Sequence, residues 1–160
     1  MKVLAIDPGY DRVGIAVIEK NNNTEQLIYS ECFETSSKIY FTERLGLIGQ
    51  HIRFIINEYD IDMFAIEGLF FSKNTKTALK VSEARGVIIF QAVDVGIPVF
   101  EYTPNQIKVA VTGYGKATKN DVHLMVEKLI SLDSKKRIDD EIDAIAIGLT
   151  FFAIYRKPII

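Results

Sequence analysis

The sequence predicts an α/β fold in which helices flank a five-stranded mixed sheet. Near the N-terminus, three apolar segments are separated by short polar turns, a pattern typical of antiparallel strands. Further along, short apolar segments alternate with segments of helical periodicity. We therefore expect three antiparallel strands followed by parallel ones, with helices covering the sheet.

The first three strands are expected at 2–6, 13–18 and around 27–33. A Pro8-Gly9 turn separates the first pair, and the polar run 21–23 separates the second. The first strand is the most apolar of all, so we expect it at the centre of the sheet.

The rest of the chain alternates between helices and strands. We expect a helix over 39–59, a strand over 63–66, a helix over 74–95, a strand over 99–102, and three helices that begin near Pro104, Asn120 and Asp139, the second reaching toward Leu132. Ser36-Ser37 is expected to cap the first helix, and Thr103 the helix that opens with Pro104.

Length and composition indicate one domain over residues 1–160, since 48% of the residues are apolar and can build a core. No apolar run is long enough to span a bilayer, and the N-terminus lacks a secretory cleavage site, so no membrane partner is expected. Cys32 is the only cysteine, which fits a reducing cytoplasm.

The net charge of −2 argues against a uniformly basic nucleic-acid binder. Basic residues nevertheless outnumber acidic ones between 72 and 119, where they are Lys73, Lys76, Lys80, Arg85, Lys108, Lys116 and Lys119. This stretch could face a phosphate backbone or form a solvated lysine-rich surface, and charge alone favours the second interpretation.

Four carboxylates are candidate metal ligands. Asp7 and Glu67 each close an apolar strand, while Asp140 and Asp143 are three residues apart and share one face of a helix. An acid at the end of a buried strand is costly to desolvate without a neutralising cation, and oxygen ligands favour magnesium or manganese. Two such cations can stabilise both the attacking and the leaving oxygen of a phosphodiester displacement.

Structural alternatives exist for each of these acids. Asp7 could stabilise the Pro8-Gly9 turn, and Asp140 with Asp143 could complement a helix dipole.

Other residues also have two interpretations. Phe70 and Phe71 could stack on an unpaired base or pack in the core or a dimer contact. The segment 113–116 could approach a phosphate at the start of the next helix or form an ordinary helix–helix turn. His51 and His123 have no metal-ligand spacing with the acids and are expected at the surface or in packing, and Cys32 in the core.

Several segments follow one another in a characteristic order: Ala5-Ile6-Asp7-Pro8-Gly9, Phe64-Ala65-Ile66-Glu67, Ala78-Leu79-Lys80, Ala84-Arg85-Gly86, Pro98-Val99-Phe100-Glu101-Tyr102, and the run Asp140 to Ala146. From residue 3 to about 150, this order resembles the RuvC family of Holliday junction resolvases. The resemblance implies a ribonuclease H-like fold. It also implies a magnesium-dependent endonuclease of recombination and repair, which nicks four-way junctions symmetrically and leaves 5′-phosphate and 3′-hydroxyl ends.

Residue by residue, the resemblance makes Asp7, Glu67, Asp140 and Asp143 the catalytic metal ligands, holding two Mg²⁺ per subunit, with Mn²⁺ as a substitute. It makes Phe70 the aromatic that enters the junction, and places basic DNA contacts at Lys108 and Lys119. It further implies a homodimer that uses the helix around 74–95, and a RuvA–RuvB branch-migration partner. Gly68-Leu69 and the second aromatic, Phe71, depart from the family pattern in the loop that follows Glu67.

Two other functions stay open at this stage. A sugar- or acetate-kinase-like phosphotransferase shares the fold and a similar first strand, but usually needs two domains around its nucleotide. A non-catalytic junction-binding module is the other, although a pure binder gains nothing from collecting acids near a phosphate backbone.

Overall fold

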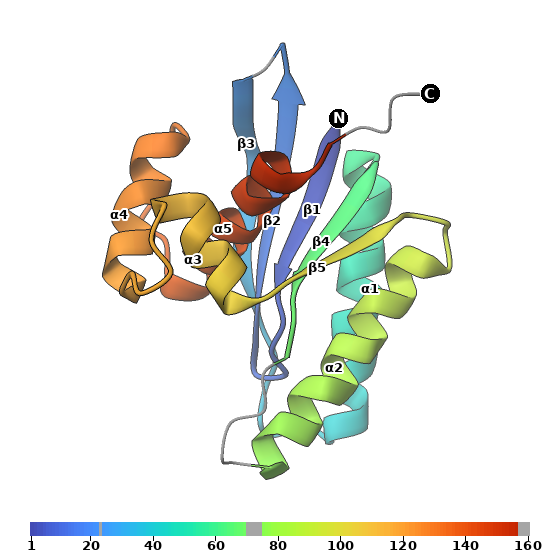
Figure 1. Cartoon of the computed structure of the whole chain (residues 1–160). Coiled ribbons are helices and arrows are strands. Elements are labelled where there is room, and N and C mark those ends of the chain that lie inside the picture. Colours follow the sequence, from blue (N-terminus) through green and yellow to red (C-terminus); the bar gives the residue numbers. More distant parts are fainter. Residues whose placement is uncertain (23, 70–74, 157–160) are drawn as a thin grey trace.

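The computed structural model describes residues 1–22, 24–69 and 75–156, and the side chains of all of these except 75 and 76. A central sheet separates two layers of helices. Figure 1 shows α1 and α2 on one side of the sheet and α3, α4 and α5 on the other. This arrangement confirms the predicted α/β class.

The sheet has five strands in the order β3-β2-β1-β4-β5, so the first strand lies at its centre, as predicted. β1 pairs antiparallel with β2 and parallel with β4, β2 pairs antiparallel with β3, and β4 pairs parallel with β5. The strands are β1 (Lys2–Asp7), β2 (Arg12–Asn21), β3 (Thr24–Glu34), β4 (Met63–Glu67) and β5 (Val99–Tyr102).

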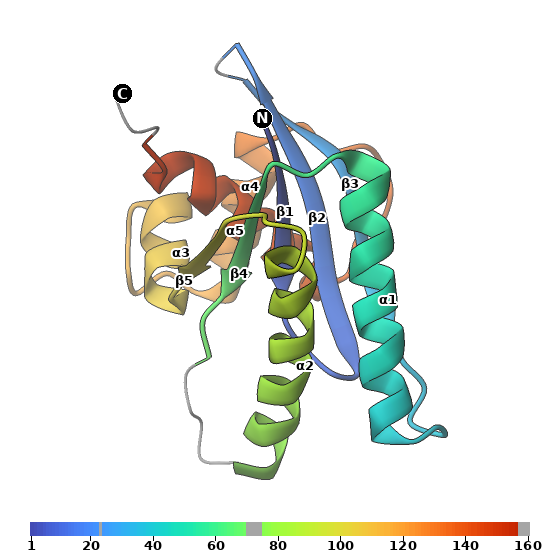
Figure 2. The same cartoon turned by 90° about the vertical axis from the view of Figure 1, so that its right-hand side faces the viewer.

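Two long helices, α1 (Phe41–Tyr59) and α2 (Thr75–Val93), cover one face of the sheet (Figure 2). Alternate residues of the strands point to this layer because successive strand side chains face opposite sides. Leu4 and Ile6 of β1, for example, are fully buried beneath Ile52 of α1. Burying an aliphatic side chain of this size contributes about 1.5–3 kcal/mol.

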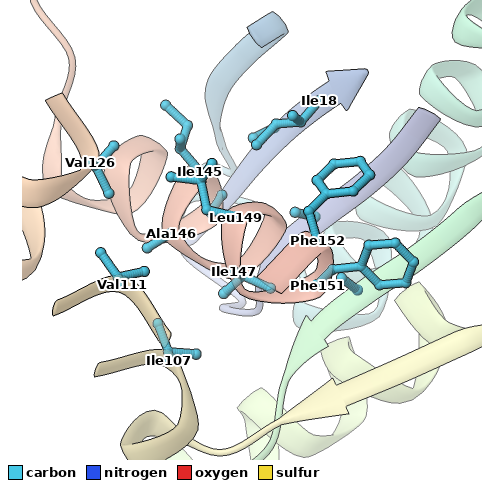
Figure 3. Close-up of a cluster of buried hydrophobic side chains, with 14 of the residues drawn as sticks. Ile18, Ile107, Val111, Val126, Ile145, Ala146, Ile147, Leu149, Phe151 and Phe152 are labelled. Carbon is cyan, nitrogen blue, oxygen red and sulfur yellow. The ribbon is translucent and has the colours of Figure 1, made fainter. Parts of the chain in front are cut away.

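The other face is covered by α3 (Pro104–Thr112), α4 (Lys119–Leu129) and α5 (Asp139–Ile154). α5 lies between the sheet and the other two helices, so almost every side chain from Ala144 to Phe152 is buried (Figure 3). A Cβ at Gly148 would lie 2.7 Å from Cδ1 of Ile18, so this glycine lets α5 approach β2 closely. The helix that carries Asp140 and Asp143 is thereby fixed against the sheet.

The expected cap of the first helix was wrong. α1 begins at Phe41 after Tyr40, whose backbone N–H donates to Oε2 of Glu43 at 3.2 Å. The Ser36 hydroxyl instead accepts from the Lys38 N–H at 3.2 Å, which makes a local turn. The predicted cap of α3 is confirmed, since the Thr103 hydroxyl accepts from the Gln106 N–H at 3.1 Å.

α4 ends at Leu129, earlier than expected, because Ile130 turns to extended backbone and is buried in the core. No helix within the described ranges combines the length and the apolar character that a membrane span requires.

Candidate active site

Asp7 and Glu67 lie at the same edge of the sheet. β1 and β4 run parallel, and their register pairs Ile6 with Ile66, so both strands end side by side. The end of β4 is fixed by its neighbours: Nε of Arg85 donates to the Glu67 carbonyl at 3.1 Å, and the Gly68 N–H donates to the next strand, β5. Parallel pairing of β1 and β4 therefore brings Asp7 and Glu67 to neighbouring strand ends.

A glycine lets the third acidic segment reach this edge. Gly14 of β2 pairs with Asp7 in the sheet register. A Cβ at this position would lie 2.0 Å from the backbone oxygen of Asp140 and 3.1 Å from Cβ of Asp7. Since only a residue without a side chain fits there, Gly14 allows the first turn of α5 to lie beside Asp7. Sequence reasoning missed this role.

Three of the four predicted acids, Asp7, Glu67 and Asp143, line one cavity of about 240 Å³. The other lining residues are two lysines and a set of mostly apolar side chains: Lys108, Lys119, Pro104, Ile107, Val122, Ala146 and Ile147. Asp140 is not among the lining residues. Its Oδ2 lies 3.7 Å from Nη1 of Arg12.

The electrostatics of the cavity favour protonated acids. Burial, and then the nearby carboxylates of Glu67, Asp143 and Asp140, raise the pKa of Asp7 to about 7. Burial and the Asp143 carboxylate raise the pKa of Glu67 to about 7. Lys119 partly offsets both shifts.

Lys119 supplies positive charge inside this acidic cavity. Its Nζ lies 2.8 Å from Oδ2 of Asp143 and 3.4 Å from Oδ2 of Asp139. Burial opposes the charge of Lys119, but the hydrogen bonds and the charges of these two carboxylates outweigh burial and raise its pKa.

The donor set suits a hard divalent cation, because every acidic group at the cavity offers carboxylate oxygen. In the part of the chain that is described, no three His, Cys, Asp or Glu side chains stand close enough together to ligate one ion as they are. The residues fit a cation that would draw the carboxylates together.

His123 is a neighbour of the site that sequence reasoning placed elsewhere. Its side chain is mostly buried, which fits the expected packing role, but its Nε2 also donates to Oδ1 of Asp143 at 3.0 Å, a contact that residue spacing did not indicate by itself. The sequence does contain one indication, since His123 follows Lys119 by four residues and therefore shares its helix face.

His51 and Cys32 lie away from the cavity. His51 contacts Glu31 and stacks on Phe33 at a ring distance of 4.1 Å. Cys32 is half-buried in β3, and burial raises its pKa to about 11.

The predicted DNA contacts differ in their surroundings. Lys80 is exposed, with its Nζ 5.4 Å from the rings of Tyr10 and Phe41. Arg85 has protein partners, because its Nη2 lies 2.5 Å from Oε2 of Glu101 and its Nε binds the Glu67 carbonyl. Phe70, Phe71 and Lys73 lie outside the described residues, as does the side chain of Lys76.

The segment 113–116 has the geometry of a helix–helix turn. Gly113 ends α3 with a φ of 74°, and its N–H donates to the Val109 carbonyl. The start of α4 is occupied by its own cap, in which the Thr118 hydroxyl accepts from the Asp121 N–H at 3.2 Å. Lys116 is exposed in this turn.

Comparison with known proteins gives a consistent result. The family model described as crossover junction endodeoxyribonuclease RuvC matches residues 3–151. The RuvC of Halothermothrix orenii is 42% identical over 156 residues, which cover 98% of this chain and 94% of the relative. The T. thermophilus RuvC solved in complex with Holliday junction substrate has a TM-score of 0.88 and 33% identity, covering 95% of this chain and 93% of that one.

The yeast mitochondrial Holliday junction resolvase Ydc2 has a TM-score of 0.68 at 10% identity, with 94% of this chain and 78% of that one covered, so it shows the fold alone. The expected ribonuclease H-like architecture is confirmed by these neighbours. Since the family model spans nearly the whole chain and a relative is 42% identical over 98% of it, this chain belongs to the RuvC family of crossover junction endodeoxyribonucleases.

Proposed function

We propose that the protein is a metal-dependent endonuclease that cuts four-way DNA junctions. The observation that carries this proposal is the gathering of Asp7, Glu67 and Asp143 around one cavity that also holds Lys108 and Lys119. Acids with raised pKa values are suited to receive a cation, and lysines beside them are suited to a phosphate. The names of the relatives supply the substrate class, a crossover junction.

The residues proposed to hold the metal are Asp7, Glu67, Asp140 and Asp143, with two Mg²⁺ per subunit and Mn²⁺ as a substitute. When bound, such cations activate a water and neutralise charge on the attacking and leaving oxygens. Lys108 and Lys119 then hold the scissile phosphate, while Ile107 and Val122 keep bulk water away from it. The products are a 5′-phosphate and a 3′-hydroxyl.

Contacts with the rest of the junction are assigned to residues around the cavity. Lys80 and Lys116 are exposed and are proposed to meet backbone phosphates, and Lys73 and Lys76 are proposed for the same role. Arg85 is proposed to act indirectly, because its Nε binds the Glu67 carbonyl and so fixes the end of β4. Phe70 is proposed to stack on an unpaired base, a contact worth roughly 1–3 kcal/mol.

Symmetric nicking needs two active sites, so we propose a homodimer that uses α2. Exposed apolar side chains on the helical layer, such as Phe54 on α1 and Phe90 on α2, support burial against a second copy. Each subunit is proposed to be a single domain over 1–160, acting in the cytoplasm in recombination and repair, with a RuvA–RuvB complex as its motor.

The test is incubation of the protein with a four-way junction and with linear duplex, each with and without Mg²⁺. Paired nicks in the junction alone, only with metal, support the proposal. Cleavage of linear duplex at the same rate would refute junction selectivity, and cleavage in EDTA would refute the metal requirement. Nucleotide binding without any cleavage would favour the phosphotransferase alternative, and junction binding without cleavage would favour the non-catalytic one.

A further inference from the structure

We infer that His123 is a positioning residue that fixes the carboxylate of Asp143 so that one of its oxygens stays on the cavity side. This inference rests on the proposed function, because it assigns His123 a role in preparing a metal ligand. His123 itself touches neither a cation nor DNA in this role.

The two oxygens of Asp143 have different neighbours. Oδ1 accepts a hydrogen bond from Nε2 of His123 at 3.0 Å, and Oδ2 lies 2.8 Å from Nζ of Lys119. Lys119 lines the acidic cavity and His123 does not. Oδ1 is therefore bound by a residue outside the cavity, while Oδ2 lies at the cavity wall beside the Lys119 ammonium group.

His123 is itself held in place. Its side chain is 16% exposed, and the flanking residue Val122 and the next-turn residue Val126 are buried against α5. The start of α4 is locked by the reciprocal cap of Thr118 and Asp121. The imidazole is thus attached to a rigid element, which is what a group that orients a metal ligand requires.

The apolar contacts of α4 do not depend on the imidazole, so its loss should leave the helix folded and the Asp143 carboxylate held by Lys119 alone. The terminal torsion of an Asp side chain is broad, so a carboxylate held through one oxygen samples orientations that do not suit the cavity. Loss of a partner that orients a ligand typically lowers metal affinity 10–100-fold.

The test measures Mn²⁺ binding by calorimetry with the full-length protein and no DNA, and the unfolding temperature in EDTA. The variants are His123→Ala, His123→Gln and His51→Ala. Gln keeps an N–H donor of similar reach. His51 is a matched control, because it also pairs with a carboxylate, that of Glu31, and its side chain is similarly buried, at 22% exposed.

We expect His123→Ala to weaken Mn²⁺ binding 10–100-fold, His123→Gln to stay within a few-fold of wild type, and His51→Ala to bind normally whatever its unfolding temperature. Unchanged affinity in His123→Ala would overturn the inference alone, and so would equal losses in the Ala and Gln variants. A wild-type protein that neither binds Mn²⁺ nor cuts a junction would defeat the proposed function, and the inference with it.

Discussion

Replacing Asp7 by Asn should stabilise the metal-free protein at pH 8. In the structure, burial and then the carboxylates of Glu67, Asp143 and Asp140 disfavour the ionised form of Asp7 and raise its pKa to about 7. Asn has nearly the same shape and carries no charge. The substitution therefore removes an unfavourable interaction that exists only while the site lacks a cation.

The magnitude and the pH window follow from proton linkage. Between about pH 4 and pH 7 the folded protein binds more protons than the unfolded chain, because the pKa of Asp7 is near 3.8 when unfolded and about 7 when folded. The free energy of unfolding therefore falls as pH rises through this window. The full difference corresponds to about 4 kcal/mol, and because Asp7 is only partly buried we expect about 2–4 kcal/mol.

The assay is urea unfolding in EDTA at pH 4 and pH 8, with Glu58→Gln as a control on an exposed acid of α1. Asp7→Asn should gain about 2–4 kcal/mol over wild type at pH 8 and little at pH 4, whereas Glu58→Gln should stay within about 0.5 kcal/mol at both. Adding Mg²⁺ should stabilise wild type more than the variant. A variant less stable than wild type at pH 8, or equally stabilised at both pH values, would refute this account of the cavity.

Three further predictions concern the supports of the site. Gly14→Ala should cost about 1–3 kcal/mol of unfolding free energy and lower the cleavage rate, because the new Cβ would clash with the Asp140 carbonyl. The control Gly46→Ala should be neutral or stabilising, because no atom lies within 4 Å of its Cβ position. Equal effects of the two variants in urea unfolding would contradict the role assigned to Gly14. Glu141→Ala should cost about 3 kcal/mol of unfolding free energy. Glu141 is buried, accepts hydrogen bonds from Ser30 at 3.0 Å and Lys135 at 3.1 Å, and neutralises the buried side chain of Arg137. The matched variant Glu127→Ala, at an exposed position of α4, should leave the unfolding free energy nearly unchanged. Lys108→Ala should weaken junction binding and reduce the slope of log affinity against log salt by about one, measured by fluorescence anisotropy; an unchanged slope would remove Lys108 from the phosphate contacts.

The sheet and its acidic edge could be predicted because they depend on local patterns. Alternation of apolar segments predicts the strands, and parallel pairing brings the ends of β1 and β4 together, with Asp7 and Glu67 at one edge. The start of α1 could not be fixed in this way, since Ser36 is a good cap residue by type, yet its hydroxyl serves a local turn.

The rest of the site depends on tertiary packing. The spacing of Asp140 and Asp143 predicts a shared helix face, but the approach of α5 to the sheet, allowed by Gly14, decides that only Asp143 lines the cavity. Glu141 has the pattern of a solvated first-turn acid, yet the segment before α5 folds over β3 and buries it with Arg137. Neither outcome is encoded in residue spacing.

A crystal structure grown with Mn²⁺ would show whether Asp7, Glu67 and Asp143 hold a divalent cation in their shared cavity. We expect anomalous density in this cavity, with carboxylate oxygens at roughly 2.0–2.3 Å from the ion, and no density there in crystals of Asp7→Asn. Saturating Mn²⁺ that leaves the cavity empty, or that is held only by residues elsewhere on the molecule, would contradict this expectation.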